Sequence, residues 1–136
     1  MTEIFVSEPH KSKNPESAKR RVLLQDDGYY WFLYWYFEAA SLPPRKHELI
    51  DLYAHAELFG YQLQRFIEEL DEARTDVLSK PEQWSVRVGW NGETMSKETE
   101  RYESVERSRM VALIDDLLSI AREAHDQDLK LFSIGD

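Results

Sequence analysis

The chain of 136 residues contains no cysteine and only five glycines and five prolines. Without cysteine there are no disulfide bonds, no thiolate nucleophiles and no cysteine ligands for zinc, which fits a reducing compartment and predicts a cytoplasmic location. So few glycines leave little material for a phosphate-binding loop. Neither that loop nor a dinucleotide fingerprint, a nucleophile elbow or a zinc-protease motif occurs. The sequence therefore favours a non-enzymatic protein without a cofactor or a bound metal.

Long apolar runs are missing as well. The longest one, residues 28–37, is about half of the roughly 20 residues that a helix needs to cross a bilayer. The first 21 residues lack the continuous apolar core of a signal peptide. Hydrophobic residues nevertheless make up 42% of the chain, which is enough to build the core of one domain. We therefore expect a folded protein that has no membrane partner.

The chain is acidic, and its charge is unevenly distributed. The net charge is −9, but residues 1–21 carry five basic and three acidic side chains, so residues 22–136 sum to −11 (12 basic minus 23 acidic). An acidic surface repels the phosphates of nucleic acids and attracts cationic proteins. We therefore expect a protein partner, with a basic protein favoured, and no nucleic acid.

Two parts of the chain differ in composition. Residues 1–21 are polar, contain two prolines and show no hydrophobic period. This composition predicts a disordered tail, with at most a short strand at Ile4-Phe5-Val6. Residues 22–136 hold the periodic apolar segments and are predicted to form a single domain.

The segment GYYWFLYWYF, residues 28–37, contains eight aromatic residues in the nine positions after its glycine. Aromatic residues favour strands. Three features nevertheless favour a helix: Asp26 and Asp27 offer an N-cap, the run continues into the helix-compatible EAAS, and Pro43-Pro44 ends it. The sequence leaves both structures open, and the helix is the preferred interpretation.

Periodic apolar residues predict most of the other elements. The pattern alternates as in a strand over residues 47–58 and repeats at helical spacing over residues 61–80 and 108–124, where Ser108 is the expected N-cap. A final apolar strand, residues 129–134, is expected within the sheet, because such a segment would be a liability if it hung free.

A β-hairpin is predicted around Asn91-Gly92. Tryptophan and valine alternate with other residues over residues 84–90, and Asn-Gly supplies the two positive-φ residues of a type I′ turn. A two-residue loop would place Trp90 opposite Glu93. Together the elements predict an α+β fold with a mixed or antiparallel sheet of about four strands and three helices packed mainly on one face.

A helix over the aromatic segment has two different faces. One face gathers Tyr29, Phe32, Leu33, Tyr36, Phe37 and Ala40. The opposite face gathers Tyr30, Trp31, Tyr34, Trp35 and Glu38. Tyrosine and tryptophan combine an apolar ring with a polar tip, which suits contact surfaces. Either both faces are buried in the core, or the second face is held out for a partner.

The candidate partner-binding residues combine this second face with acidic side chains of the helix predicted over residues 61–80. They are Tyr30, Trp31, Tyr34, Trp35, Glu68, Glu69 and Glu72. The acidic residues are equally compatible with a solvated helix face that binds nothing.

A second candidate site lies on the strand predicted over residues 47–58. Its polar side chains Asp51, Tyr53, His55 and Glu57 point to one side and include acid–base types. Same-side neighbours on a strand lie about 6.8 Å apart, which is far for one small ion. These four residues are therefore either a solvated sheet face or an alternative ligand-binding site.

Four segments resemble the pattern of a family of short, acidic bacterial proteins. They are GYYWFLYWYFE, LIDLYAHAEL, PEQWSVRVGW and LFSIGD, which occur in the family's order and span about residues 25–136. This chain has Ala54 where the pattern has glycine, and Ile134 separates Ser133 from Gly135. The resemblance implies no activity or catalytic residue. By size and charge only, such proteins are similar to immunity proteins, which neutralise a cognate toxin.

These observations favour a non-enzymatic bacterial binding protein, with an immunity-type inhibitor of a basic partner as its most concrete form. The alternative is a small-molecule-binding domain or small enzyme with a pocket between the aromatic helix and the sheet. A third option is a homodimer formed through the aromatic segment.

Overall fold

The computed structural model describes residues 2–7, 21–40, 50, 55–92 and 95–135, with the backbone alone for 2–7. The strands are β1 (Thr2–Ser7), β2 (Arg21–Leu24), β3 (His55–Leu58), β4 (Gln83–Trp90), β5 (Glu100–Glu106) and β6 (Lys130–Gly135). The helices are α1 (Gly28–Ala39), α2 (Gly60–Leu78), α3 (Arg107–Asp126) and the short 3₁₀ helix η2 (Lys97–Thr99).

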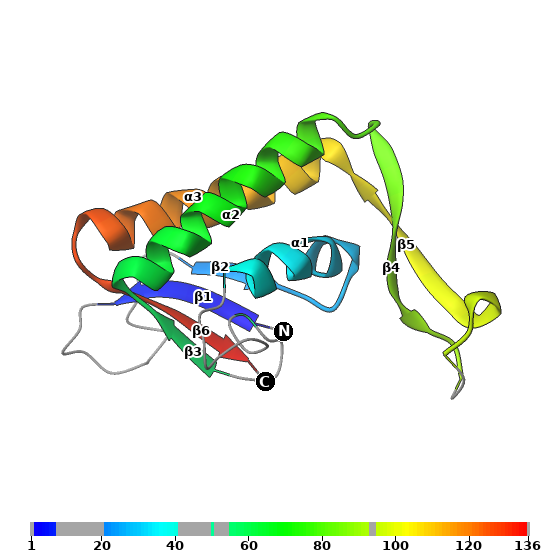
Figure 1. The fold of residues 1–136 in the computed structure, drawn as a ribbon, viewed down its shortest axis with the longest axis horizontal. Helices are drawn as coiled ribbons and strands as arrows, with labels where there is room; N and C mark the ends of the chain where they lie inside the picture. The colour runs from blue at the N-terminus through cyan, green and yellow to red at the C-terminus, as the bar shows by residue number, and fades with distance from the viewer. Residues whose placement is uncertain (1, 8–20, 41–49, 51–54, 93–94, 136) are drawn as a thin grey trace.

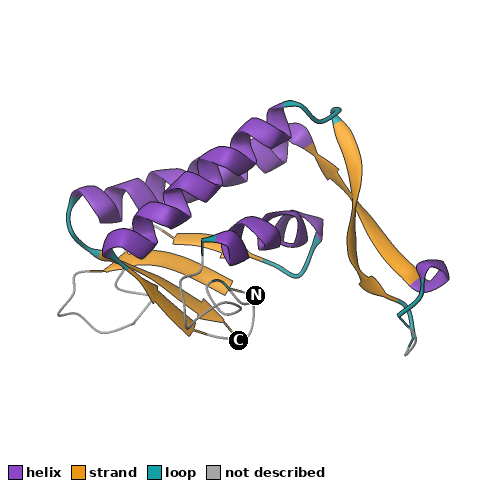
Figure 2. Ribbon diagram, in the orientation of Figure 1, coloured by secondary structure: helices purple, strands orange, loops and turns teal. Residues whose placement is uncertain are grey.

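The fold is α+β, with three α-helices and antiparallel strands, as predicted. The prediction of one sheet is wrong, because the described strands form two: a four-stranded sheet in the order β2-β1-β6-β3, and the separate β4-β5 hairpin. Figure 1 shows α2 and α3 lying together on one side of the four-stranded sheet, with α1 beside them. The hairpin extends from the end of α2 and the start of α3, away from that sheet (Figure 2).

Strand β1 lies within the segment that was expected to be a disordered tail. It contains Ile4-Phe5-Val6, the stretch at which the sequence indicated a short strand, and it pairs with β2 on one side and β6 on the other. Residues 2–7 and Arg21 thus lie in strands, which the expectation of a disordered tail allowed only at Ile4-Phe5-Val6. Position 1 and residues 8–20 lie outside the described residues.

Strand β6 is an interior strand of the four-stranded sheet, which confirms its predicted place. It is antiparallel to both neighbours, and its Ser133 lies between Ile4 of β1 and Ala56 of β3. On β3, Ala56 and Leu58 are buried while His55 is exposed, which is the predicted alternation. The earlier part of that predicted strand, residues 47–49 and 51–54, lies outside the described residues.

Helix α1 confirms the helical interpretation of the aromatic segment. The carboxylate of Asp27 accepts hydrogen bonds from the backbone N–H groups of Tyr29 (3.0 Å) and Tyr30 (3.1 Å), which satisfies two donors that a helix start leaves open. The expected cap at Asp26-Asp27 therefore forms, and it fixes where the aromatic residues begin to coil.

The buried face of α1 is rotated from the predicted one. It consists of Tyr30, Leu33, Phe37 and Ala40, whereas Tyr29, Phe32 and Tyr36 are only partly buried. Tyr30 can enter the core because its hydroxyl donates a 2.8 Å hydrogen bond to the carbonyl of Ile50, so burial leaves no polar atom unbonded.

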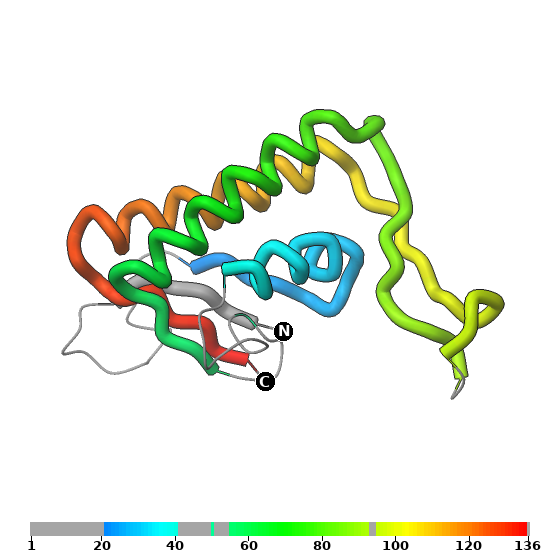
Figure 3. The backbone as a smooth tube through the Cα atoms, viewed as in Figure 1, coloured from blue at the N-terminus to red at the C-terminus, as the bar shows by residue number. Residues whose placement is uncertain are grey.

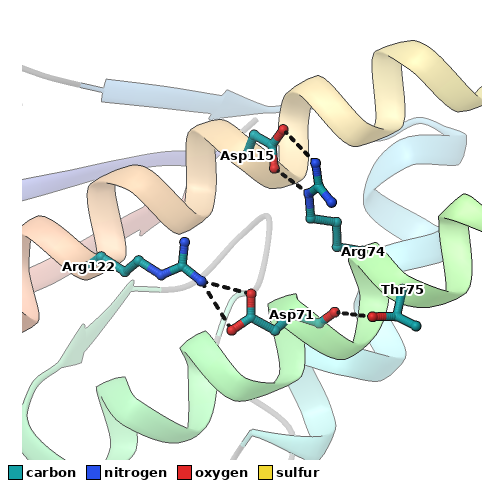
Figure 4. A network of polar contacts seen from close by, with 5 residues as sticks. All are labelled: Asp71, Arg74, Thr75, Asp115 and Arg122. Carbon is teal, nitrogen blue, oxygen red and sulfur yellow. Dashed lines mark hydrogen bonds and ion pairs between the residues drawn. The ribbon is translucent and has the colours of Figure 1, made fainter.

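Helices α2 and α3 pack along their predicted apolar faces. The buried residues are Leu63, Phe66, Leu70, Ala73 and Val77 of α2, and Met110, Ile114, Leu117, Leu118, Ile120, Ala121 and Ala124 of α3. Above this seam Arg74 bonds Asp115 (2.7 Å) and Arg122 bonds Asp71 (2.9 Å), as Figure 4 shows. The N-cap of α3 is Glu106 and not the expected Ser108, because the helix follows β5 without a loop.

The β4-β5 hairpin has a longer loop than predicted. Trp90 pairs with Glu100 and not with Glu93, and the register shifts between Arg87 and Gly89. Asp128 is the only described non-glycine residue with a positive φ, so Asn91 does not adopt the conformation that a type I′ turn requires. The N–H of Asn91 instead donates to the carbonyl of Thr99 (2.6 Å), which closes a wider loop containing η2.

Close packing joins the start of α1 to the hairpin. A Cβ atom on Gly28 would lie 2.7 Å from Cγ1 of the buried Val105, and Phe32 contacts Trp84 with 5.5 Å between ring centroids. We expect Gly28→Ala to lower the free energy of unfolding by about 1–3 kcal/mol through overpacking. Urea unfolding measures this change, and it should shrink when Val105→Ala is also present. Equal costs in both backgrounds would contradict the predicted clash.

The hydroxyl of Ser133 is fully buried without a hydrogen-bond partner. We expect Ser133→Ala to raise the free energy of unfolding by about 1 kcal/mol, because an unbonded polar group leaves the interior. Ser104→Ala, at an exposed position of β5, is the matched control and should change stability by less than about 0.5 kcal/mol. A loss of stability in Ser133→Ala would refute this account.

Candidate interaction surface on helices α1 and α2

Trp35 is the exposed ring of the aromatic helix, with 65% of its surface accessible. Its neighbours direct their polar tips to acceptors within the protein. Trp31 donates to Asp26 (2.6 Å), Tyr34 to Glu38 (2.8 Å) and Tyr36 to Asp76 (2.5 Å). Within the described part of the chain, the indole of Trp35 makes only an edge contact with Tyr34, at 5.8 Å between centroids. Its N–H group is therefore available to a partner.

Contacts along α1 and α2 show that the two helices run in opposite directions, which Figure 3 also makes visible. At the end of α1, the carbonyl of Ala39 accepts a 3.2 Å hydrogen bond from Arg65, near the start of α2. One turn earlier, Tyr36 reaches Asp76. Trp35 precedes Ala39 by four residues and lies on the same side of α1. Trp35 also lies opposite the buried Leu33 and Phe37, so its exposed ring points away from the core.

The charges of α2 are balanced on one flank and unbalanced on the other. On the flank facing α3, Asp71 and Arg74 are paired with Arg122 and Asp115, and the four charges sum to zero (Figure 4). The other flank, which we call the acidic flank, consists of Arg65, Glu68, Glu69, Glu72 and Asp76 and carries one positive and four negative charges, a net of −3. The excess negative charge of α2 thus lies beside α1.

Arg65 neutralises only part of the acidic flank. Its guanidinium bonds Glu68 (3.2 Å) and Glu69 (3.3 Å). Glu72 is exposed, and no described residue forms an ion pair with it. An isolated exposed carboxylate gains little from the fold, so Glu72 is free to pair with a cation from outside.

The pKa of the Tyr36 phenol reflects the negative charge of the acidic flank. Burial raises the pKa of Tyr36 above its ordinary value, and so do the hydrogen bond to Asp76 and the negative charges of Asp76, Glu72 and Glu69. All of these effects disfavour the phenolate. The protonated hydroxyl therefore ties α1 to the acidic flank at ordinary pH.

The seven predicted partner-binding residues differ in exposure. Trp35, Glu68 and Glu72 are exposed and Glu69 is partly buried, while Trp31 and Tyr34 are partly buried and bonded to acids of their own segment. The assignment of Tyr30 to an exposed contact surface is wrong. It is buried because it lies in line with Leu33 and Phe37 and its hydroxyl finds the carbonyl of Ile50.

Sequence reasoning missed Tyr61, which is as exposed as Trp35. Tyr61, Arg65, Glu68 and Glu72 follow the i, i+4, i+7, i+11 spacing of one helical stripe, so Tyr61 continues the acidic flank toward the start of α2. That spacing was legible in the sequence. The predicted contact residues came only from the aromatic segment and the glutamates, and Tyr61 belongs to neither.

The alternative ligand-binding residues do not form a convergent site among the described residues. Asp51 and Tyr53 lie outside the described part of the chain. Nδ1 of His55 accepts a hydrogen bond from the N–H of Gly135 (3.2 Å), and Glu57 pairs with Lys130 (3.4 Å), so both side chains join β3 to β6. In the described part of the chain, no three histidine, aspartate or glutamate side chains are grouped to hold a metal ion.

Two of the hollows that described residues line lie away from His55 and Glu57. One, of about 560 Å³, is bordered by Glu82, Gln83, Glu106, Arg107, Ser108 and Val111, where the hairpin meets α3. The other, of about 220 Å³, lies between the end of β2 and α3. Neither is the pocket that was predicted between the aromatic helix and the sheet.

Comparisons with known proteins gave no relative. No family model matches the chain, and no match was found among curated proteins or solved structures. The resemblance to a family of short acidic bacterial proteins therefore stays a prediction. Among the described residues, every helix is too short or too polar to cross a bilayer.

The contact between Tyr36 and the acidic flank predicts a stability change at alkaline pH. Because the folded state raises the pKa of Tyr36, its stabilisation is complete below the unfolded tyrosine value of about 10 and is lost as the pH rises above it. We expect Tyr36→Phe to be less stable than the wild type at pH 8 and to lose less stability between pH 9 and 11.5. Urea unfolding across this range tests the prediction.

Tyr61→Phe is the matched control, because Tyr61 is exposed and makes no hydrogen bond with a described residue. It should keep the alkaline slope of the wild type. An unchanged slope in Tyr36→Phe would show that its phenol is not linked to folding.

Proposed function

We propose that the protein is a non-enzymatic bacterial binding protein that engages a basic protein partner through Trp35 and the acidic flank of α2. An immunity-type inhibitor, which covers a cationic toxin surface in the cytoplasm, is the most concrete form of this function. The observation that carries the proposal is that Trp35 is exposed with no hydrogen bond from its N–H group to a described residue, in a protein whose acidic flank keeps a net charge of −3.

The composition of this surface is that of an energetic centre of an interface. Tryptophan, tyrosine and arginine dominate such centres, because a rigid aromatic ring buries a large area at low entropic cost. Trp35 stands on a helix whose opposite face is fixed by Leu33 and Phe37, so little order has to be gained on binding. Tyr61 and the acidic flank would add polar contacts from α2.

The negative charge of the acidic flank favours a basic protein partner. The acidic flank carries a net of −3 in a chain of net charge −9. Such a field speeds the approach of a basic protein and slows that of an acidic one, and added salt weakens both effects. It also opposes close contact between two copies of this face, which disfavours a homodimer formed through α1.

Photocrosslinking at position 35 tests whether this surface meets a protein. A photoreactive phenylalanine analogue replaces Trp35, and in a matched control it replaces Met95, an exposed residue of the hairpin loop. In cells of the native host we expect a discrete adduct from position 35 that position 95 does not give, and the purified adduct partner should be basic. Identical adducts from both positions, or none from position 35, would count against the proposal.

Association kinetics with the partner so identified test the acidic flank. We expect Glu68→Gln, Glu69→Gln and Glu72→Gln together to lower the association rate roughly tenfold at low ionic strength and to flatten its salt dependence. The control combines Glu82→Gln, Glu98→Gln and Asp126→Asn, exposed positions off the flank, and changes the net charge equally. Equal effects of the two triple variants would show that the flank affects association only through the net charge of the protein.

A further inference from the structure

We propose that β5 pairs edge to edge with β5 of a second copy of this chain, about a two-fold axis at Tyr102, so that two hairpins form one four-stranded antiparallel sheet. The inference goes beyond the proposed function, because it concerns the hairpin and neither Trp35 nor the acidic flank. It follows from the support of the hairpin, from the backbone groups that face its edge and from the order of charges along β5.

The hairpin is supported at one end. At its base Trp84 contacts Phe32, and the buried Val105 lies against Gly28. Figure 1 shows its loop end standing apart from α1, α2 and α3. A two-stranded hairpin that gains neither a further strand nor a helix on its face is marginally stable. Within the described part of the chain, the loop half of the hairpin therefore lacks the packing that its base has.

The backbone hydrogen bonds show which groups of β5 face its open edge. At the base, the N–H of Arg107 donates to the carbonyl of Glu82 (2.8 Å). Near the loop, the N–H of Asn91 donates to the carbonyl of Thr99 (2.6 Å). Groups that bond the partner strand alternate along an antiparallel pair with groups that face outward. The outward groups are therefore those of Glu100, Tyr102, Ser104 and Glu106.

One side chain already uses part of this edge. The hydroxyl of Tyr29 accepts a hydrogen bond from the N–H of Glu106 (3.0 Å). Among the described residues, no other group bonds to the outward backbone of β5. The edge from Glu100 to Ser104 is therefore open to a further strand, and Tyr29 sets its limit toward α3.

The order of charges along β5 favours one symmetric register. With the two-fold axis at Tyr102, Arg101 lies opposite Glu103 of the second copy, and the symmetry repeats this pair. An axis at Arg101 would set two arginines opposite each other, and an axis at Glu103 would set two glutamates. An axis closer to α3 would need the N–H of Glu106, which Tyr29 already holds. A slip by one residue would pair outward groups with inward ones.

The side chains at the centre of this register can make the inferred contacts. Arg101 is exposed and Glu103 is partly buried, and neither forms an ion pair with a described residue. Tyr102 is 53% exposed and lies on the face of β5 opposite to the buried Val105. In the dimer the two Tyr102 side chains would be cross-strand neighbours and would cover each other.

Strand β4 is less suited to the same pairing. The register shift between Arg87 and Gly89 places an extra residue in β4, so the edge of β4 is irregular, whereas β5 runs without an insertion. Arg87 is the one charged residue of β4, so no symmetric register of β4 brings opposite charges together. Pairing of β5 with β4 of another copy would be head to tail, and such a contact does not close with two copies.

Cysteine cross-linking tests the register in the full chain, which has no cysteine of its own. The Arg101→Cys and Glu103→Cys variants are oxidised separately and as an equal mixture. We expect the mixture to give a disulfide-linked heterodimer, because these positions face each other with about 4.5 Å between Cα atoms. Each variant alone should give at least about fivefold less dimer, since its two thiols lie diagonally, beyond the reach of a disulfide.

A charge exchange tests the same pair without a disulfide. Arg101→Glu and Glu103→Arg each set like charges opposite each other twice, so each should raise the dimer dissociation constant about tenfold or more. The double variant restores opposite charges and should bind within about threefold of the wild type. Asp116→Arg, at an exposed position of α3, controls for the change in net charge and should leave dimerisation unchanged.

Sedimentation equilibrium in about 0.15 M salt measures these constants, at protein concentrations up to about 1 mM because so short an interface is expected to be weak. Urea unfolding verifies that each variant is folded. A wild type that stays monomeric at about 1 mM would overturn the inference. So would equal cross-linking of the mixture and the separate variants, or a double variant as weak as the single ones.

Discussion

The packing of one side of α1 against α2 is the interaction on which the rest of the molecule depends. Phe37 stacks on Phe66 with 5.7 Å between ring centroids, and both are fully buried. An aromatic side chain buries about 150–250 Å², worth roughly 4–6 kcal/mol when that area leaves water. This contact and that of Phe32 with Trp84 fix α1 between α2 and the hairpin. The direction of Trp35 follows from this fixation, because opposite sides of one helix cannot turn independently.

The acidic residues of the chain supply hydrogen-bond acceptors for the polar atoms of the aromatic helix. Tyrosine and tryptophan cannot lie near a core with their polar tips unbonded. Here carboxylates accept those tips: Asp26 for Trp31, Glu38 for Tyr34 and Asp76 for Tyr36. The same residue type therefore has two roles: it accepts hydrogen bonds from these rings, and on the acidic flank it supplies the negative charge of the surface.

Much of the fold could be predicted from local signals in the sequence. The cap at Asp27, the apolar stripes of α2 and α3 and the apolar strand β6 depend on neighbouring residues, and all are present. The division into two sheets and the pairing of β1 with β6 could not be predicted, because they join residues far apart in the chain. The hairpin register failed for a related reason: Arg87, Glu100 and Trp90 interact across the strands and favour a longer loop than Asn91-Gly92 alone suggests.

The candidate surface was only partly predictable. The exposure of the glutamates and of Trp35 could be predicted, but the burial of Tyr30 depends on the acceptor that its hydroxyl finds at Ile50, which no local pattern reveals. The same holds for the two flanks of α2. Asp71 and Glu72 are adjacent in sequence and alike in chemistry. Asp71 forms an ion pair with Arg122 of α3, whereas Glu72 has no ion pair with a described residue.

The position of β6 has a consequence for biosynthesis. This strand follows all the others in the chain, yet it lies between β1 and β3. While the ribosome is still producing α3, β1 and β3 have no strand to join them, whereas α2 and the hairpin can already form from contacts within their own segments. Sheet assembly must therefore wait until translation has passed β6, and a nascent chain paused before that point would present two open strand edges to chaperones.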